Sequence, residues 1–374
     1  MEPVLFQELE AASGKKVAIA TLNAEKSLNA LSLPMVQALM PQLLTWQQDD
    51  TIAMVMLQGA GEKAFCAGGD IRDLYFAMKE HPGEYTHQVE TFFAQEYQLD
   101  YLIHTYDKPI LLWGQGIVMG GGLGLMAGAS HRVVTESSRI AMPEITIGLY
   151  PDVGGTWFLN RMPGKSGLFL GLTGASINAA DAKYIGLADH FVSEANKAQV
   201  MDSLLQVSWG DTQALNHQKL ADVLREFERV SATAMPKGNV QPHQSMIDGL
   251  CEGESIVEIA ANILGYEGDD KWLNRAKGSL AHGSPTTAHI VFQQLQQGQS
   301  LSLEQCFQME LSVSVRCGQS GEFAEGVRAL LIEKDNQPKW AYSDIQSVPE
   351  SVVQEVFTPL WSEDAHPLKD LGAK

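Results

Sequence analysis

The 374-residue sequence predicts an α/β fold for residues 1–195 and a mainly helical region for residues 196–374. Three observations predict this fold class and its organisation. In the first half, short apolar runs that end in turn residues alternate with stretches of helical spacing, as in parallel strands joined by helices. Beyond residue 195, apolar residues recur mostly at helical spacing. With 45% hydrophobic and 19% charged residues, the composition is that of a globular protein with a substantial core.

The first half contains four expected strand segments: KVAIATLN (16–23), IAMVMLQG (52–59), KPILLWGQGIV (108–118) and HRVVTE (131–136). Each is a short apolar or β-branched run bounded by turn residues. Between the first two lies SLPMVQALMPQLLTW, whose apolar residues have helical spacing. Ser32 is its expected N-cap and Pro34 lies in its first turn. Pro41 is expected to kink this helix or divide it.

The second half contains four segments that are mostly helical in pattern. Two of them begin with a capping-box pattern, Ser255 before Glu258 and Ser302 before Gln305, which is typical of helix N-termini. The four segments are TQALNHQKLADVLREFERVSA (212–232), SIVEIAANIL (255–264), SPTTAHIVFQQLQQ (284–297) and SLEQCFQMEL (302–311).

The net charge of −19 argues against a general nucleic-acid binder, because the phosphate backbone is bound by clustered Lys and Arg. A small polyanionic ligand needs only a local basic cluster, so it is not excluded. The N-terminus has neither a basic segment nor an apolar segment of signal-peptide type. No CxxC pair occurs, and the cysteines are few for this length: Cys66, Cys251, Cys306 and Cys317. A reducing, cytoplasmic setting is therefore expected.

Residues 109–130 carry no charge and are long enough to span a bilayer. Seven of them are glycine, however, and glycine contributes little apolar surface. A buried strand, a glycine-rich turn and a buried helix explain the segment better, so no membrane association is expected.

Two glycine clusters precede helix-like stretches, one at Gly68 and Gly69 and the other at residues 120–122. Glycine lets backbone N–H groups approach a ligand closely, and a helix N-terminus adds the positive end of a dipole. Two such turns could direct two N–H donors at one oxygen as an oxyanion hole, in which losing one donor costs about 2.7–4 kcal/mol. Close packing of a helix on a sheet is the simpler alternative.

Dinucleotide binding is a second alternative. Residues 122–127, GLGLMA, match the G-x-G-x-x-A pattern, and Glu144 follows 22 residues after Gly122. The match lies far into the chain, and Glu144 stands in AMPE instead of at a strand end, which argues against a nicotinamide enzyme.

The segment MPEITIGLYPDVGGT (142–156) contains two acids, Glu144 and Asp152, among apolar residues, prolines and glycines. A structural explanation exists for each: Glu144 as a helix cap and Asp152 as a turn residue after Pro151. The alternative is that both carboxyl groups serve chemistry in a site that excludes bulk water.

Five motifs, in this order and spacing, resemble the crotonase (enoyl-CoA hydratase/isomerase) superfamily, and within it the 3-hydroxyisobutyryl-CoA hydrolases. They are KAFCAGGDI (63–71), GQGIVMGGGLGL (114–125), AMPEITIGLYPDVGGTWFL (141–159), LTGASINAADAKYIGLADHFV (172–192) and SGEFAEGVRALLIEKDNQPKW (320–340). The resemblance implies a spiral of ββα turns that carries an acyl-CoA site, followed by a helical C-terminal region. It also implies thioester hydrolysis in valine catabolism, with no cofactor or metal, because CoA is part of the substrate.

The resemblance also assigns roles to residues. The backbone N–H groups of Gly69 and Gly121 match the two oxyanion donors of the superfamily. Glu144 matches an acid that hydratases share, whereas the second hydratase acid falls at Gly124, which has no side chain. Asp152 stands where hydratases read PGxGG, and this exchange is the pattern of the hydrolases. Glu144 is then either a general base or a nucleophile, and both remain open.

Four weaker assignments concern substrate contacts. Glu96 matches an acidic substrate-contacting position of the hydrolases, with a solvated helix residue as its alternative. Lys26 and Lys63, with Arg72, are candidates for binding the CoA phosphates, with plain surface charge as their alternative.

Superfamily members often form trimers, so the resemblance allows a homo-oligomer. Enoyl-CoA hydration or isomerisation, and a weakly catalytic CoA- or RNA-binding relative, remain alternative functions.

Overall fold

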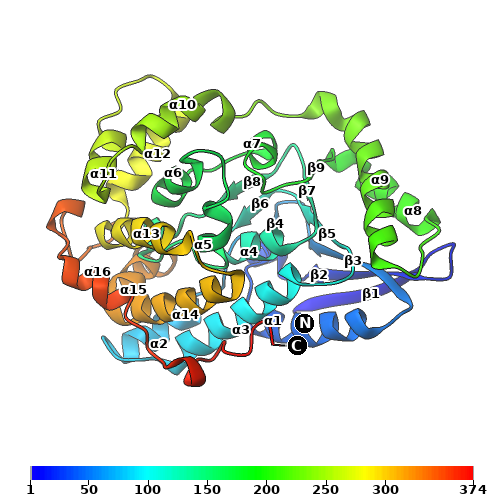
Figure 1. Ribbon diagram of the computed structural model, residues 1–374, viewed down its shortest axis with the longest axis horizontal. Coiled ribbons are helices and arrows are strands. Elements are labelled where there is room, and N and C mark those ends of the chain that lie inside the picture. The colour runs from blue at the N-terminus through cyan, green and yellow to red at the C-terminus, as the bar shows by residue number, and fades with distance from the viewer. Residues whose placement is uncertain (1, 374) are drawn as a thin grey trace. The chain divides into compact units, whose positions relative to one another are not determined.

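The computed structural model describes residues 2–373 and divides into two compact units (Figure 1). Unit 1 comprises the chain up to Gly69, Leu99–Ile140 and Ile177–Asn239; unit 2 comprises Asp70–Gln98, Ala141–Ser176 and the chain from Val240 onward. The expected boundary at residue 195 separates mixed from helical sequence, and no strand follows Phe191 among the described residues. The compact units follow another division, because each is assembled from three separate segments.

Unit 1 is built on a six-stranded sheet with the order β1-β2-β3-β5-β7-β9. β1 pairs antiparallel with β2, and the other neighbours in the sheet are parallel. The strands are β1 (Val4–Glu10), β2 (Lys16–Leu22), β3 (Ile52–Gly59), β5 (Ile110–Gly114), β7 (His131–Val134) and β9 (His190–Phe191).

A second, three-stranded sheet has the order β4-β6-β8. Its strands are β4 (Ala64–Cys66), β6 (Ile117–Met119) and β8 (Arg139–Ala141). The helices of unit 1 are α1 (Leu33–Gln48), α4 (Gly121–Gly128), α7 (Ala179–Tyr184), α8 (Lys197–Gln206) and α9 (Gln213–Ser231).

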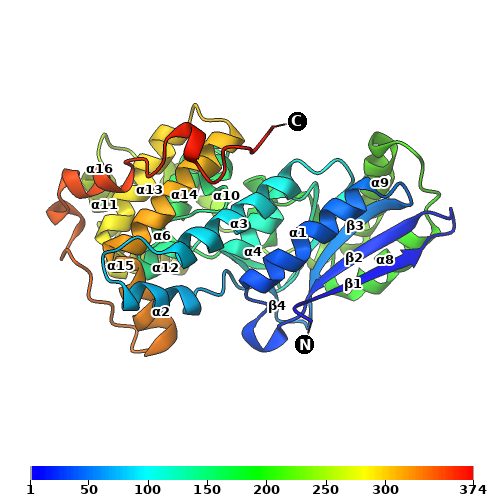
Figure 2. The ribbon, with the colours of Figure 1, turned by 90° about the horizontal axis from the view of Figure 1, so that it is seen from below.

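The large sheet of unit 1 is covered on both faces. Val17 and Ile19 of β2 belong to a core that also contains Leu204 of α8 and Leu220 of α9. Because strand side chains alternate between faces, the residues between them point to the opposite face. There β1 meets α1 (Figure 2). The indole N–H of Trp46 donates to Glu8 Oε1 at 2.9 Å.

Unit 2 is mainly helical, and its helices from Val240 onward run from green to red in Figure 1. Helix α3 (His87–His104) contributes its residues up to Gln98 to this unit. The other helices are α2 (Arg72–Glu80), α5 (Gly155–Leu159), α6 (Ser166–Thr173), α10 (Val240–Leu250), α11 (Ile256–Leu264), α12 (Lys271–His282), α13 (Pro285–Gly298), α14 (Leu303–Ser320), α15 (Glu322–Val327) and α16 (Glu350–Val356).

The expected strand and helix segments are confirmed, with several differences. Strands β1, β4, β8 and β9 were not expected, and the segment at 108–118 contains two strands, β5 and β6, instead of one. Pro41 does not divide helix α1, because the burial of apolar side chains such as Leu39 and Leu43 outweighs one lost hydrogen bond. The capping box at Ser302 is complete, whereas at Ser255 only half forms, because Glu258 bonds to the N–H of Glu254 instead.

The uncharged segment at residues 109–130 forms β5, β6 and α4, as expected. No helix within the described residues is long and apolar enough to cross a membrane.

Candidate active site

Glu144 begins a short 3-10 helix, η2 (Glu144–Ile147), in unit 2. The turn closes at Gly148, which has φ +68°, and a Cβ there would lie 2.5 Å from the carbonyl oxygen of Glu322. Only glycine fits such a position without strain. The N–H of Ser284 also donates to the carbonyl of Ile145 at 2.9 Å. The backbone that carries Glu144 is therefore held from two sides.

Asp152 stands at the start of a strained loop. Val153 has φ +54°, which is an outlier for a β-branched residue, and Gly154 has φ +86°. Glu310 of α14 secures this loop, because its two carboxylate oxygens accept the N–H groups of Gly154 and Thr156 at 2.8 and 2.9 Å. The loop conformation therefore depends on a buried carboxylate far away in the sequence.

Glu144, Asp152 and Glu96 are three buried acids of unit 2, with exposed fractions of 4%, 3% and 2%. Burial raises the pKa of all three carboxyl groups, and the charge of Asp152 raises those of Glu144 and Glu96 further. For Asp152 burial outweighs a hydrogen bond from Tyr97 and raises the pKa to about 7. Because Glu96 is buried, the alternative interpretation of it as a solvated helix residue is excluded.

Two oxygens of these acids have no hydrogen-bond partner among the described residues: Oε1 of Glu96 and Oε2 of Glu144. Buried polar atoms are nearly always bonded in folded proteins, so an unbonded carboxylate oxygen is a candidate contact for water or substrate. Glu144 can act on a water molecule, and Glu96 can accept a hydroxyl group. The sequence assignments of both residues fit this geometry.

A group of residues that the sequence did not identify surrounds Asp152. The hydroxyl of Tyr97 donates to Asp152 Oδ2 at 2.7 Å and lies 2.7 Å from the hydroxyl of Ser314. Tyr150 contacts Ser314 at 2.9 Å and donates to the carbonyl of Glu310 at 2.6 Å. No sequence signal identifies them, because the pair Tyr97 and Ser314 is 217 positions apart.

The glycine clusters lie in unit 1. Gly69 follows β4, and Gly121 is the first residue of α4. Gly122 contacts the end of β4 so closely that a Cβ would meet the carbonyl of Cys66, so close packing explains this glycine. No acceptor among the described residues bonds to the N–H of Gly69 or to that of Gly121. These two free amides come from two packed segments, as an oxyanion hole requires.

The basic candidates for CoA are exposed. Lys26 lies in a 3-10 turn, η1 (Glu25–Ser27), and Lys63 precedes β4. The two segments are neighbours in unit 1, since a Cβ at Gly61 would meet the side chain of Glu25. Arg72 is the exposed first residue of α2 in unit 2. The structure leaves the cationic groups of all three accessible to a phosphate.

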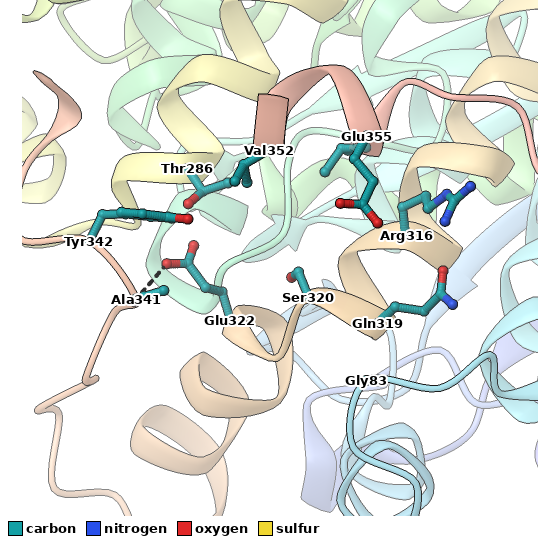
Figure 3. Close-up of a pocket in the computed structure, with 11 residues that line it drawn as sticks. Gly83, Thr286, Arg316, Gln319, Ser320, Glu322, Ala341, Tyr342, Val352 and Glu355 are labelled. Atoms are coloured by element: carbon teal, nitrogen blue, oxygen red, sulfur yellow. Dashed lines mark hydrogen bonds between the residues drawn. The ribbon is translucent and has the colours of Figure 1, made fainter. Parts of the chain in front are cut away.

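A cavity of about 310 Å³ lies in unit 2 (Figure 3). It adjoins the turn that carries Glu144, because Glu322, one of its lining residues, packs against Gly148. Glu322 forms part of its wall and accepts the N–H of Ala341 and the hydroxyl of Ser284, at 2.9 and 2.5 Å. Glu144, Asp152 and Glu96 do not line this cavity. Glu322 therefore connects the wall of this cavity to the turn that carries Glu144, through Gly148 and Ser284.

Similarity to known proteins covers most of the chain. Residues 17–357 match the family described as enoyl-CoA hydratase/isomerase. The chain belongs to the enoyl-CoA hydratase/isomerase family. Among curated proteins of the family, it is 41% identical over 362 residues to the mitochondrial 3-hydroxyisobutyryl-CoA hydrolase of Danio rerio, covering 96% of this chain and 91% of that protein. It is 37% identical to the protein of the same name from Homo sapiens, with 92% and 87% covered.

Solved structures of this family confirm the predicted crotonase-like fold. An enoyl-CoA hydratase from Rhodobacter sphaeroides superposes with a TM-score of 0.81 at 33% identity, covering 96% of this chain and 98% of that one. A carnitinyl-CoA dehydratase from Mycobacterium thermoresistibile gives 0.85 at 32% identity, with 99% of both chains covered. The coverage extends through the helical C-terminal region.

The expected cytoplasmic setting is wrong by the same comparisons. The curated relatives are named as mitochondrial proteins, which contradicts this expectation. The reason for the error is physical: four buried cysteines that form no disulfide indicate a reducing setting, but they do not distinguish one reducing compartment from another.

Proposed function

We propose that this protein hydrolyses the thioester of 3-hydroxyisobutyryl-CoA to 3-hydroxyisobutyrate and CoA. The observation that carries the proposal is the pair of buried acids Glu144 and Asp152 in one unit, with no acid at Gly124. The names of the curated relatives, at 35–41% identity over nearly the whole chain, support the same substrate. We also propose that the reaction belongs to valine breakdown, as the resemblance to the 3-hydroxyisobutyryl-CoA hydrolases implies.

In the proposed reaction, the thioester oxygen accepts hydrogen bonds from the amides of Gly69 and Gly121, which stabilise the charge that develops on it. Glu144 either takes a proton from the attacking water or attacks the carbonyl carbon itself. The C–S bond then breaks, and Asp152 handles the proton at the reacting end. Glu96 accepts the 3-hydroxyl of the acyl group through its unbonded oxygen.

The reaction as proposed needs no cofactor or metal, because a carboxyl pair and two amides supply the acid, the base and the electrostatic stabilisation. Lys26 and Lys63 would bind the CoA phosphates. We also propose that the chain binds no nucleic acid and that it can form a homo-oligomer, which sedimentation velocity would test.

A second candidate function is enoyl-CoA hydration. It is favoured by the two solved relatives, which are an enoyl-CoA hydratase and a carnitinyl-CoA dehydratase at 33% and 32% identity. Gly124 argues against it, because hydratases of the superfamily resemble this chain except for a second glutamate at that position.

One assay separates the two candidates. The protein is incubated in turn with 3-hydroxyisobutyryl-CoA and crotonyl-CoA, while free thiol and enoyl absorbance are followed. Thiol release from the first substrate, without enoyl loss from the second, is the expected result. Loss of enoyl absorbance from crotonyl-CoA with no thiol release from either substrate would replace hydrolysis by hydration.

The role of Glu144 has its own test. Single-turnover hydrolysis in oxygen-18 water places label in the Glu144 carboxylate only if a mixed anhydride forms and water attacks it at that carboxyl. Label in Glu144 would therefore support the nucleophilic mechanism. Unlabelled Glu144 with labelled product is the result expected of a general base, and also of an anhydride that water attacks at the acyl carbon.

A further inference from the structure

A chain of hydroxyl groups connects Asp152 to a backbone carbonyl in unit 2. It runs from Asp152 to Tyr97, Ser314 and Tyr150, and it ends on the carbonyl of Glu310. The four oxygen–oxygen distances are 2.7, 2.7, 2.9 and 2.6 Å, all within the range of O–H···O hydrogen bonds. The three hydroxyl residues are fully buried.

The number of hydrogens in this chain depends on Asp152. The carbonyl of Glu310 only accepts, so the hydroxyl hydrogen of Tyr150 is used there. Tyr97 and Ser314 each supply one more hydrogen. If Asp152 is ionised, three hydrogens must serve four contacts, and two oxygens then face each other without a hydrogen between them. If Asp152 carries a proton, each of the four contacts receives one hydrogen.

We propose that Tyr97, Ser314 and Tyr150 form a directional hydrogen-bond chain that holds a proton on Asp152 in the resting protein. The three are positioning residues, because they act through Asp152 and not on the substrate. An ionised Asp152 accepts from Tyr97, and protonation reverses this bond. With Asp152 protonated, its O–H donates to Tyr97, Tyr97 donates to Ser314, Ser314 donates to Tyr150, and Tyr150 donates to the carbonyl of Glu310.

The consequence for the reaction rests on the proposed function. As the C–S bond breaks, its electron pair goes to sulfur, and the proton of Asp152 converts the departing thiolate into the thiol of CoA. The attacking water gives up a proton in the same turnover, and this proton restores the one that Asp152 lost. Atoms and charge therefore balance without any further reactant.

The groups that face Asp152 are themselves acidic. They come from α3, η2, α14 and the segment between η2 and α5, and no lysine or arginine stands among them: Glu96, Tyr97, Glu144, Tyr150, Glu310 and Cys317. Negative neighbours disfavour an additional negative charge. Burial likewise raises the pKa of Asp152, to about 7. Both effects favour a protonated Asp152, and the hydrogen count favours the same state.

The hydrogen count predicts opposite effects for neighbouring substitutions. Ser314→Ala leaves two contacts and two tyrosine hydrogens, so an ionised Asp152 is then fully accommodated. Tyr150→Phe does the same with two contacts and the hydrogens of Tyr97 and Ser314. Both should lower the pKa of Asp152. Tyr97→Phe removes the hydrogen-bond partner of a buried carboxyl group and should raise this pKa.

Infrared difference spectroscopy measures the proton directly. The carboxylic C=O stretch of Asp152 is identified by its absence in Asp152→Asn and is titrated against pH in the wild type and in the three variants. We expect shifts of about one pH unit, downward for Ser314→Ala and Tyr150→Phe and upward for Tyr97→Phe. Two downward variants keep the test informative if one of them fails to fold.

Shifts in the same direction in all folded variants would overturn the proposal, as would the lack of an Asp152 carboxylic band in the wild type at pH 6. The spectra require no turnover. Opposite shifts in a protein that does not hydrolyse the thioester would therefore reject the proposed function and keep the chain. Hydrolysis without these shifts would reject the chain and keep the function.

Discussion

At the scale of single residues, the site contains acids with free oxygens in a dry environment. Glu144 is 4% exposed, and its Oε2 bonds to no described residue. Burial raises the pKa of this carboxyl group, which brings a weak base closer to the pH at which it must accept a proton. A buried carboxyl group with an unbonded oxygen is explained more readily by a role in a reaction than by a role in holding the fold.

Glu144→Gln should therefore lower kcat for thioester hydrolysis by about 10²-fold or more, the usual contribution of a positioned base or nucleophile. The measurement is the rate of thiol release at saturating substrate, with thermal unfolding as the check on folding. Hydrolysis near the wild-type rate in a folded variant would show that Glu144 is not the reacting group.

Glu96 should determine the preference for a 3-hydroxyl group. In Glu96→Leu, the ratio of kcat/KM for 3-hydroxyisobutyryl-CoA to that for isobutyryl-CoA should fall about tenfold, because the hydrogen bond between the carboxyl group and the 3-hydroxyl is lost. Glu96→Gln keeps a carbonyl acceptor and serves as the matched control, with a smaller loss. An unchanged ratio in both variants would remove Glu96 from substrate recognition.

At the scale of elements, the conformation of the site depends on glycines at turns. Gly148 ends η2 with φ +68° directly against Glu322, whereas Gly321 has φ +82° and no atom within 4 Å of an added Cβ. A side chain at either position would have to adopt the unfavourable left-handed backbone. Only at Gly148 would its Cβ also clash with a neighbouring residue.

Gly148→Ala should therefore destabilise the protein by more than Gly321→Ala, for which only the left-handed backbone costs about 1–2 kcal/mol. Chemical denaturation of the two variants measures the difference. Because η2 carries Glu144, Gly148→Ala should also lower kcat, and Gly321→Ala should leave it unchanged. Equal stability losses would mean that the Gly148 turn relaxes freely away from Glu322.

The elements also show what the sequence could and could not predict. Local patterns were sufficient for β2, β3, α1 and the glycine turns at β4 and α4, because each depends on neighbouring residues. The clamp of Glu310 on the Asp152 loop was not predictable, since its partners are more than 150 positions apart. The same holds for Tyr97 and Ser314, which look like ordinary helix residues in the sequence.

At the scale of the molecule, stability at acid pH should depend on a histidine cluster in unit 1. His131 is 7% exposed; its Nε2 lies 3.1 Å from Nδ1 of His217, and its ring stacks on His190. Burial, together with the charges of His217, His190 and Arg132, lowers the pKa of His131 to about 4, against a small opposing effect of Asp189.

Between about pH 6.5 and pH 4 the unfolded chain therefore binds a proton at this position that the folded chain does not. Stability should fall as the pH drops through this range, and His131→Gln should lose less than the wild type over the same interval. Unfolding temperatures at pH 7 and pH 4.5 provide the measurement, with His87→Gln, at an exposed side chain, as control. A parallel decline in His131→Gln and wild type would assign the acid sensitivity elsewhere.

The interleaving of the two units has a consequence for how the protein is made. Every segment of unit 1 precedes residue 240, so this unit can be complete while the rest of the chain is still being translated. Glu144 and Asp152 are synthesised early, but Glu310 and Ser314 leave the ribosome far later. A nascent chain therefore contains Glu144 and Asp152 before helix α14 can supply the hydrogen bonds of Glu310 and Ser314.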